Sequence, residues 1–517
     1  MKVWIGIALA LVMSGEEIVV YGGSSAGVAA AVEARRSGRS VVLVSPEKHV
    51  GGMSVEGLGS SDINNHWFRN DVAVGGIARE FYLRVGKKYG AIGPVYLFEP
   101  HVAEQVFEEM LAGVRVVHGS LRSVEWKEGI KRIAALRLLD GTRVAGDAFV
   151  DASTEGDLLA MAGVETVIGR EANAKYGETK NGIRDVNEYR QFPFKMDPYV
   201  VEGRPESGLL PTVQGEALGV PGEGDHRIQG YCFRLCLSRN VSNRILIEKP
   251  ADYDGRKYEI YRRYARMGGE LFTPQARLPQ GKTDLGSWHD LSANLYGMNF
   301  DYPGGDAATR KRVYEEHRSF VHGLLWFLAH DEGLPEKVRA AWREWGLARD
   351  EFVDNGGWPR ALYVRDARRM VSDYVITEQH TWRVNPVVAE DPVAVAYWPP
   401  DTHHVRRIVR DGAVYNEGFV FGGEDWGPFG ISYRSMVPRA REALNLITPT
   451  CLSSSHVAYG AVRIEFTFMA LGQAAAVAAD LMLREKTTMQ KVPYGKLRAG
   501  LIQRGVVVSL NLPVAKQ

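Results

Sequence analysis

The sequence predicts an α/β fold, and the prediction rests on strand and helix patterns that alternate near the N-terminus. Residues 18–21 (IVVY) form an apolar strand that leads into a turn of small residues, 22–27 (GGSSAG). An alanine-rich helix follows and is stopped by Gly38, and residues 41–44 (VVLV) form a second apolar strand. A strand, a tight glycine turn, a helix and a second strand are typical of the unit that opens a dinucleotide-binding domain.

The turn is the part of this unit that carries chemistry. Its backbone N–H groups and the helix N-terminus would face a pyrophosphate, where the helix dipole favours negative charge. Glycine is needed because a Cβ would hold the phosphate off the backbone or push the helix away from the strand. We therefore expect the chain to bind FAD or NAD(P). The expected contacts in the turn are Gly22, Gly23, Ser24, Ser25, Ala26 and Gly27.

Two positions depart from the usual dinucleotide motif. The middle glycine of the turn is replaced by Ser24, and Ser45 stands where an acidic residue commonly binds the ribose hydroxyls. A neutral residue there, with Lys48 nearby, would also accept the extra phosphate of NADP. An ordinary strand–helix turn without a nucleotide is the remaining alternative.

Length and composition limit the classes of function that the chain can have. A chain of 517 residues should contain more than one domain. The net charge of +1 gives no reason to expect a nucleic-acid or membrane-surface partner. The charge run RKRVYEEHR (310–318) is interpreted as a solvated helix face. Of three cysteines, Cys232 and Cys236 lie four apart without neighbouring histidines, so neither a disulfide framework nor a metal site is expected.

Residues 1–15 carry one lysine and then an apolar run that is too short to span a bilayer but fits a signal peptide. Neither an A-x-A cleavage site nor a twin-arginine pattern is present. We expect a periplasmic or secreted protein without stable membrane insertion, and a cytoplasmic location is the alternative.

The rest of the chain divides by composition. The nucleotide-binding part is predicted to extend over residues 16–165. Residues 166–435 are aromatic-rich and interrupted by prolines, which favours a separate α+β substrate domain. Residues 436–485 contain a strand, a Ser/His-bearing loop and a long helix whose small residues would pack closely on a flat surface, either a sheet or a ring system. Residues 486–517 form a C-terminal extension.

Several distant motifs resemble one group of flavoproteins. The segments GGSSAGVAAA, HVGGM and FVDASTEGDLLAMAG (149–163), with the closing small-residue helix, resemble FAD-dependent oxidoreductases of the glutathione-reductase-like fold. The segments GREANAKYGE, YCFRLCLS, KTD, YVRDARRMVSDYV, YWPPDTHHV and CLSSSHVAYGAVRIE are similar to one bacterial family of FAD-dependent oxidoreductases, some of whose members are labelled xanthan lyase. The resemblance covers nearly the whole chain.

The resemblance implies FAD as the cofactor, bound by an FAD-binding Rossmann-like domain with the substrate domain inserted. It places Asp157 near the ribityl–pyrophosphate region and the closing helix with its N-terminus toward the flavin. Glu47 is a substitute for the acidic residue missing at Ser45, and His49 lies near where some flavoproteins attach FAD covalently. The expected FAD contacts outside the turn are Ser45, Pro46, Glu47, His49, Gly51, Gly52, Met53, Leu121, Ala152, Ser153, Asp157, Glu465, Gly472 and Gln473.

Histidines are the first candidates for the chemistry. His403 and His404 are the preferred proton acceptors, since an imidazole suits removal of a hydroxyl or amine proton. In an extended segment their side chains would point in opposite directions, so one of them would be structural. His456 and Tyr459 precede the closing helix and would either take part in the reaction or position the cofactor.

Arg365 and Arg368 would clamp a carboxylate or phosphate, or simply pair with acidic neighbours. The predicted function is FAD-dependent oxidation of a CH–OH or CH–NH bond in a polar small molecule, such as a sugar derivative. The alternatives are a carbohydrate lyase without redox chemistry and a non-catalytic flavin-binding protein. The oligomeric state is left open.

Overall fold

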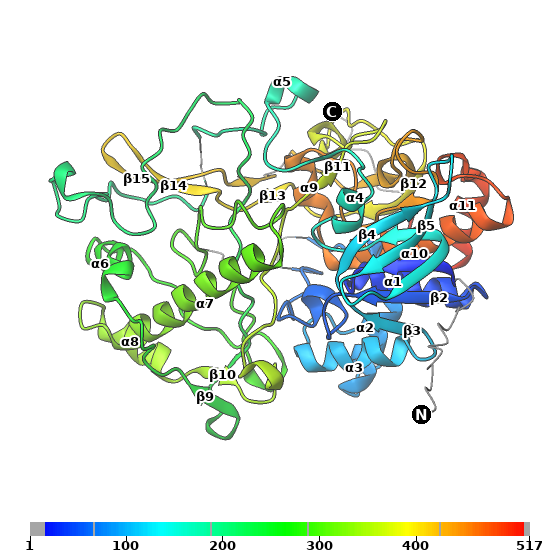
Figure 1. Ribbon diagram of the computed structural model, residues 1–517. Helices are drawn as coiled ribbons and strands as arrows, with labels where there is room; N and C mark the ends of the chain where they lie inside the picture. Colours follow the sequence, from blue (N-terminus) through cyan, green and yellow to red (C-terminus); the bar gives the residue numbers. More distant parts are fainter. Residues whose placement is uncertain (1–15, 66–67, 187–188, 287–288, 423–424, 511–517) are drawn as a thin grey trace, which may run out of the picture.

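The computed structural model describes residues 16–65, 68–186, 189–286, 289–422 and 425–510 (Figure 1). The signal peptide predicted at residues 1–15 lies outside the described residues. Two regions are visible, one built on a large sheet and one made largely of loops around a few helices.

The first region contains a seven-stranded sheet. Its order is β3-β2-β1-β6-β5-β4, and β18 pairs with β6 on the edge opposite β1. Strands β1, β2, β3, β6 and β18 are parallel, whereas β4, β5 and β6 form an antiparallel meander. The strands are β1 (Glu16–Tyr21), β2 (Val41–Ser45), β3 (Arg115–His118), β4 (Leu121–Trp126), β5 (Ile133–Leu138), β6 (Arg143–Asp151) and β18 (Leu446–Ile447). The predicted α/β fold with a Rossmann-like parallel sheet is confirmed.

Helix α1 (Ser25–Arg36) follows β1 and packs on helix α10 (Glu465–Arg484) from the far end of the chain (Figure 1). A Cβ on Gly472 would lie 2.1 Å from the Ala26 carbonyl oxygen, so this contact requires glycine. The predicted partner of this helix is a sheet or a ring system, whereas the structure packs α10 chiefly on helix α1 and also against β6. Among the described residues, α10 is the helix long and apolar enough to cross a membrane, but 89% of its apolar window is buried in the protein, as in a core helix.

The other elements of the first region surround this pair of helices. Helices α2 (Gly76–Lys88) and α3 (Pro100–Met110) pack on each other, and α2 and α11 (Tyr494–Gln503) contact α10. The apolar core of this region also takes in Val393–Ala396 of β12 (Pro392–Ala396), which pairs with β17 (Phe429–Ser432). The chain therefore returns to the first core before residue 436.

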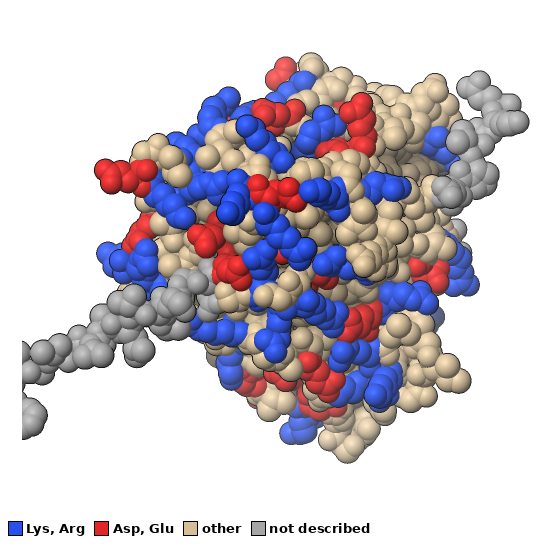
Figure 2. Space-filling model, turned by 90° about the vertical axis from the view of Figure 1, so that its right-hand side faces the viewer, with Lys and Arg blue, Asp and Glu red and all other residues tan. Residues whose placement is uncertain are grey.

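The second region has its own apolar core around helix α7 (Ala307–His330). Short elements surround it and leave much of the backbone in loops. They are α5 (Asn173–Tyr176), α6 (Glu259–Arg266), α8 (Glu336–Arg343), β7 (Thr166–Val167), β8 (Leu237–Ser238), β9 (Arg244–Leu246), β10 (Gly346–Ala348), β11 (Arg369–Met370), β13 (Asp401–Thr402), β14 (Arg406–Arg410), β15 (Ala413–Glu417) and β16 (Val420–Phe421). Two further short helices, α4 (Asp157–Met161) and α9 (His456–Val462), pack in the cores of the first region. On the face shown in Figure 2, basic and acidic side chains are interspersed.

Candidate functional site

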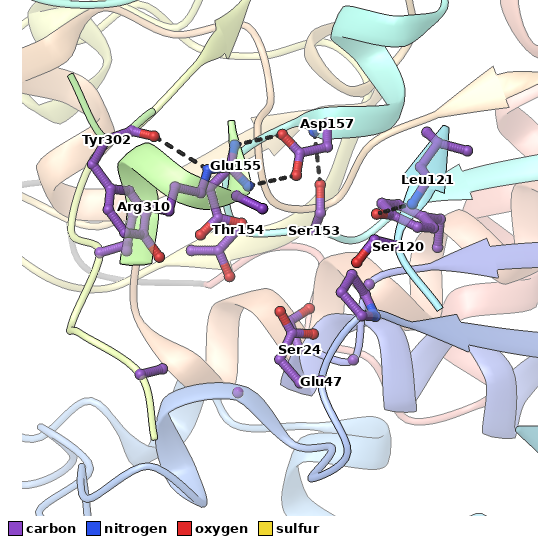
Figure 3. A pocket seen from close by; sticks show the side chains of 18 of the residues that line it. Ser24, Glu47, Ser120, Leu121, Ser153, Thr154, Glu155, Asp157, Tyr302 and Arg310 are labelled. Carbon is purple, nitrogen blue, oxygen red and sulfur yellow. Dashed lines mark hydrogen bonds and ion pairs between the residues drawn. The ribbon is translucent and has the colours of Figure 1, made fainter. Parts of the chain in front are cut away.

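A cavity of about 960 Å³ lies between the two regions (Figure 3). The first region supplies the Gly22–Ser24 turn, the segment 46–49 after β2 and the segment 152–157 after β6. The second region supplies residues 302–308 and Arg310 at the start of α7 and residues 360–362. The cavity therefore lies at the carboxyl ends of parallel strands, where open α/β sheets bind their ligands.

The turn after β1 is held by close backbone packing. Gly22 has a φ of 108°, and a Cβ there would lie 2.2 Å from the backbone nitrogen of Ser153. A Cβ on Gly27 would lie 2.0 Å from the Gly22 carbonyl oxygen. Ser24 caps helix α1, because its Oγ accepts from the Gly27 N–H at 3.2 Å and donates to the Ala152 carbonyl at 2.6 Å. The serine that replaces the middle glycine therefore has a structural role.

Several polar atoms near the N-termini of α1 and α10 fit a bound dinucleotide. Within the described part of the chain, the buried Ser54 Oγ has no hydrogen-bond partner, and the buried Ser25 hydroxyl and Glu465 carboxyl have at most each other. Buried polar groups are rarely left in this state, so a ligand is expected to satisfy them. A Cβ on Gly52 would lie 3.1 Å from the Ser25 backbone nitrogen, which shows that glycine keeps the start of α1 open. Burial raises the pKa of Glu465 to about 7, although the nearby Ser25 hydroxyl lowers it.

At the end of β2 the acidic group comes from Glu47. The buried Ser45 Oγ donates to the Glu47 carbonyl at 2.8 Å and lies 3.2 Å from its carboxylate. The Glu47 side chain opens onto the cavity, yet surrounding protein atoms desolvate it and raise its pKa. Lys48 is mostly exposed, 3.8 Å from Asp354. At the start of β4, the Leu121 N–H donates to the Tyr21 hydroxyl at 3.2 Å.

Arg310 lines the cavity, which the sequence analysis did not anticipate. Its guanidinium forms two hydrogen bonds of 2.7 Å with the Asp157 carboxylate (Figure 3). Arg368 reaches the same carboxylate at 3.0 Å. Interpreting the whole run 310–318 as a solvated helix face was wrong for Arg310, because its side chain turns into the cavity at the start of α7. Burial and the charge of Asp157 raise the pKa of Glu155 to about 7, while Arg310 opposes the shift.

His49 closes one side of the cavity. Its Nδ1 contacts Glu104 on α3, and its Nε2 lies 2.8 Å from the Asp354 carboxylate in the second region. Beside it, the Arg360 N–H donates to Glu56 at 2.6 Å. Burial raises the pKa of Glu56 to about 7, and Arg360 limits the increase.

The predicted cofactor contacts divide into two groups. Those that line the cavity are Gly22, Gly23, Ser24, Pro46, Glu47, His49, Gly52, Met53, Leu121, Ala152, Ser153 and Asp157. Those outside the lining are Ser25, Ala26, Gly27, Ser45, Gly51, Glu465, Gly472 and Gln473. Gln473 joins three helices instead, because its side chain accepts from the Ile77 N–H at 2.9 Å and donates to Glu33 at 2.8 Å.

Of the predicted catalytic residues, Arg368 lines the cavity, and the others lie deeper. His456 Nδ1 is 2.6 Å from Asp366, which also accepts from Arg369 at 2.7 Å. The Tyr459 hydroxyl donates to the Thr450 carbonyl at 2.9 Å. Arg365 donates to the Gly230 carbonyl at 2.7 Å and lies 3.1 Å from the Cys232 sulfur.

His403 and His404 face different groups, as expected for neighbours in an extended segment. His403 Nε2 lies 3.9 Å from Asp401, whereas His404 Nδ1 lies 3.3 Å from the Tyr296 hydroxyl. Burial, together with Arg365, holds the pKa of His403 well below its usual range. Burial, together with Arg407, lowers the pKa of His404 to about 3. Both shifts favour the neutral imidazole.

One acidic group resembles a metal site but contains a lysine. Glu99, His101, Asp350 and Glu351 bring their ligand atoms together, and no ion is present. The buried Lys282 ammonium lies 2.6 Å from Glu99 and 2.7 Å from Glu351. It thus supplies the positive charge that a cation would otherwise bring.

Comparisons with known proteins give the family. The chain matches the FAD dependent oxidoreductase family over residues 17–501, whereas no curated protein matches it. Similar solved structures include the flavin-dependent brominase Bmp2 (16% identity, 30% of this chain and 42% of that chain, TM-score 0.24). They also include L-proline dehydrogenase from P. horikoshii (16% identity, 31% of this chain and 59% of that chain, TM-score 0.22). A third is T. acidophilum thioredoxin reductase (18% identity, 27% of this chain and 36% of that chain, TM-score 0.18). The aligned parts cover less than two thirds of these proteins. The match over nearly all of its length shows that this chain belongs to the FAD dependent oxidoreductase family and uses FAD as its cofactor.

Proposed function

We propose that this flavoprotein oxidises a CH–OH or CH–NH bond of a polar small molecule, such as a sugar derivative. The observation that carries the proposal is the cavity, which runs from the phosphate-type turn at Gly22 to Leu362 and Val364 in the second region. One end has the features of a dinucleotide site, and the other end adjoins buried polar and charged side chains of both regions. A substrate of polar character fits that end.

Residues of the first region would hold the cofactor. The α1 N-terminus and the Ser25 and Ser54 hydroxyls would bind its phosphates and ribityl chain, and Glu47 would accept hydrogen bonds from its ribose. Glu465, whose pKa is about 7, can stay protonated and donate a hydrogen bond near neutral pH. Bound FAD supplies the acceptor for two electrons and a hydrogen.

The reaction also needs a proton acceptor. The sequence prediction assigns this role to His403 or His404, and that assignment stays a prediction. Charging His403 would add a cation beside Arg365 and Arg463, which opposes proton uptake. His404 is bonded to Tyr296 outside the cavity lining.

A carbohydrate lyase is the second candidate, which the resemblance of the sequence motifs raises. A lyase needs a base and a group that neutralises a carboxylate, and Arg368 at the cavity would serve as the latter. It has no use for a dinucleotide cavity, which favours oxidation. We also propose export to the periplasm or the medium, which N-terminal sequencing of the mature protein would test.

The test is the visible absorption spectrum of the purified protein, followed by anaerobic addition of polyols, aldoses, amino sugars and amines. We expect flavin absorption bands that one class of compound bleaches. Unsaturated sugar products without bleaching would support the lyase instead. A colourless protein that FAD cannot reconstitute would refute the proposal.

A further inference from the structure

A short acidic segment of the second region, residues 350–354 (DEFVD), lies against the first region at one side of the cavity. We call this segment the acidic turn. Its Phe352 is buried in a small apolar cluster of the second region, which anchors the segment from behind. The carboxylates of Glu351 and Asp354 point the other way and contact histidines of the first region. The acidic turn is therefore a point at which the two regions are joined.

The first contact is made by His49, which lines the cavity. Its Nδ1 contacts Glu104 of α3, and its Nε2 lies 2.8 Å from the Asp354 carboxylate of the acidic turn. A neutral imidazole has one N–H and can donate to one of the two carboxylates, whereas an imidazolium donates to both. Burial opposes the ionisation of Asp354, but Arg360 and His49 outweigh it and lower the pKa of Asp354 to about 2. This contact is therefore complete only when His49 is protonated.

The second contact is made by His101 in the first turn of α3. Its Nδ1 lies 2.7 Å from the buried Glu351 carboxylate, and its backbone N–H donates to the same group at 3.0 Å. The hydrogen bond to Glu351 raises the pKa of His101, although burial and the charge of Lys282 oppose the shift. The stabilisation from this pair is fully present below the ordinary histidine pKa of about 6.5, and it is lost as the pH rises through the raised value.

Solvent reaches both histidines, whose side chains are 16% and 34% exposed, so their protons can exchange with the medium. Charged and titratable groups of both regions surround them. Glu56 also titrates near neutral pH, because burial raises its pKa to about 7. The surrounding groups are Lys48, Glu56, Glu104, Asp354 and Arg360 near His49, and Glu99, Lys282, Asp350 and Glu351 near His101.

We propose that His49, His101 and the acidic turn form a pH-dependent clasp that closes one side of the FAD cavity and controls how long FAD stays bound. The clasp is closed while both imidazoles are protonated. Deprotonation removes the charge-assisted hydrogen bonds that join the two regions there. Because His49 and Asp354 both line the cavity, the loss of their contact opens a wall of the cofactor site. The inference does not depend on which compound the flavin oxidises.

The experiment compares the wild-type holoenzyme with His49→Gln, His101→Gln and the double variant. Glutamine offers a donor and an acceptor, as a neutral imidazole does, but it cannot take up a proton. His330→Gln is the matched control, because His330 is exposed at the end of α7 and outside the cavity lining.

Two quantities are measured from pH 6 to pH 9. The rate of FAD release is obtained from the flavin that passes a protein-retaining filter at successive times after dilution. Urea denaturation gives the free energy of unfolding of each apoprotein. For each quantity the variant is compared with the wild type at the same pH, which cancels the effect of Glu56 and of other carboxyls that titrate in both proteins.

We expect each partly exposed ion pair to slow FAD release about threefold. The double variant should therefore release FAD about 10-fold faster than the wild type at pH 6 and at nearly the same rate at pH 9. Its apoprotein should be less stable than wild type at pH 6 and equally stable at pH 9, and His330→Gln should match the wild type throughout.

A rate ratio that is constant from pH 6 to pH 9, or that equals the ratio of His330→Gln, would overturn the clasp. If the apoprotein of the double variant loses stability at pH 6 while FAD release is unchanged, the histidines join the two regions without retaining FAD, and control of the cofactor is refuted. If the double variant does not fold, the single variants decide by the same ratio, with a threefold difference expected at pH 6.

Discussion

Gly52 offers the sharpest test of where the cofactor phosphate binds. It lines the cavity with a φ of 61°, and a Cβ there would lie 3.1 Å from the Ser25 backbone nitrogen. Ser25 begins helix α1, so its N–H has no acceptor within the helix and is available to an anion. Gly52→Ala should therefore obstruct the approach of a phosphate to this N–H.

Gly38→Ala is the matched control, because Gly38 is also left-handed (φ 80°) but a Cβ there would meet no atom within 4 Å. Left-handed strain should lower the free energy of unfolding of both FAD-free variants by about 1–2 kcal/mol. Loss of one hydrogen bond to a charged phosphate is worth about 1.5–3 kcal/mol, which corresponds to roughly a 10- to 150-fold weaker Kd.

Two measurements separate the effects of strain and obstruction. Urea denaturation gives the stability of each apoprotein, and titration with FAD gives its affinity. We expect equal stability losses but weaker FAD binding in Gly52→Ala alone. If both variants bind FAD as the wild type does, the α1 N-terminus is not the phosphate site. If both lose affinity equally, backbone strain and not obstruction is responsible.

Four further outcomes follow from the same geometry. Arg310→Ala should lower the free energy of unfolding by about 1–3 kcal/mol in urea, and Arg310→Lys by less, because the bidentate pair with Asp157 is lost. The pKa of Glu465 is higher in the folded than in the unfolded apoprotein. Its contribution to the free energy of unfolding is therefore fully present below about pH 4.5 and is lost as the pH rises through 7. Glu465→Gln should therefore be up to about 3 kcal/mol more stable than wild type at pH 8 and equal to it at pH 4, and an equal gain at both pH values would contradict this. Lys282→Met should cost about 3–5 kcal/mol in thermal or urea denaturation, since it leaves buried carboxylates unpaired. Acid precipitation should release FAD to the supernatant, because carboxylates engage both ring nitrogens of His49; flavin that stays with the pellet in wild type but not in His49→Ala would contradict this.

The first strand, turn and helix could be predicted from sequence because their signals are local. Apolar strands, small turn residues and a stopping glycine lie within residues 18–44, and the helix begins at Ser25 behind the Ser24 cap. The place of Glu47 at the cavity could also be anticipated, since it lies two residues from Ser45, and its role as the ribose-binding acid stays a prediction.

The charged parts of the site could not be predicted in the same way. Arg310 lies in a charge run typical of a solvated helix, and its contact with Asp157 joins residues 153 positions apart. Glu56 lies in a loop of the first region, and its environment depends on Arg360 of the second region, whose backbone N–H donates to it at 2.6 Å.

Both ends of the cavity are completed by contacts that join the two regions. Arg310 binds Asp157 at one end, Arg360 binds Glu56 along the side, and Tyr363 contacts Arg463 at the other end. Each pair combines a residue from the second region with one near the FAD-binding sheet. Because a ligand in the cavity would touch both sides, its binding free energy also stabilises the docking of the two regions. The second region would therefore help to hold the cofactor as well as cover the substrate.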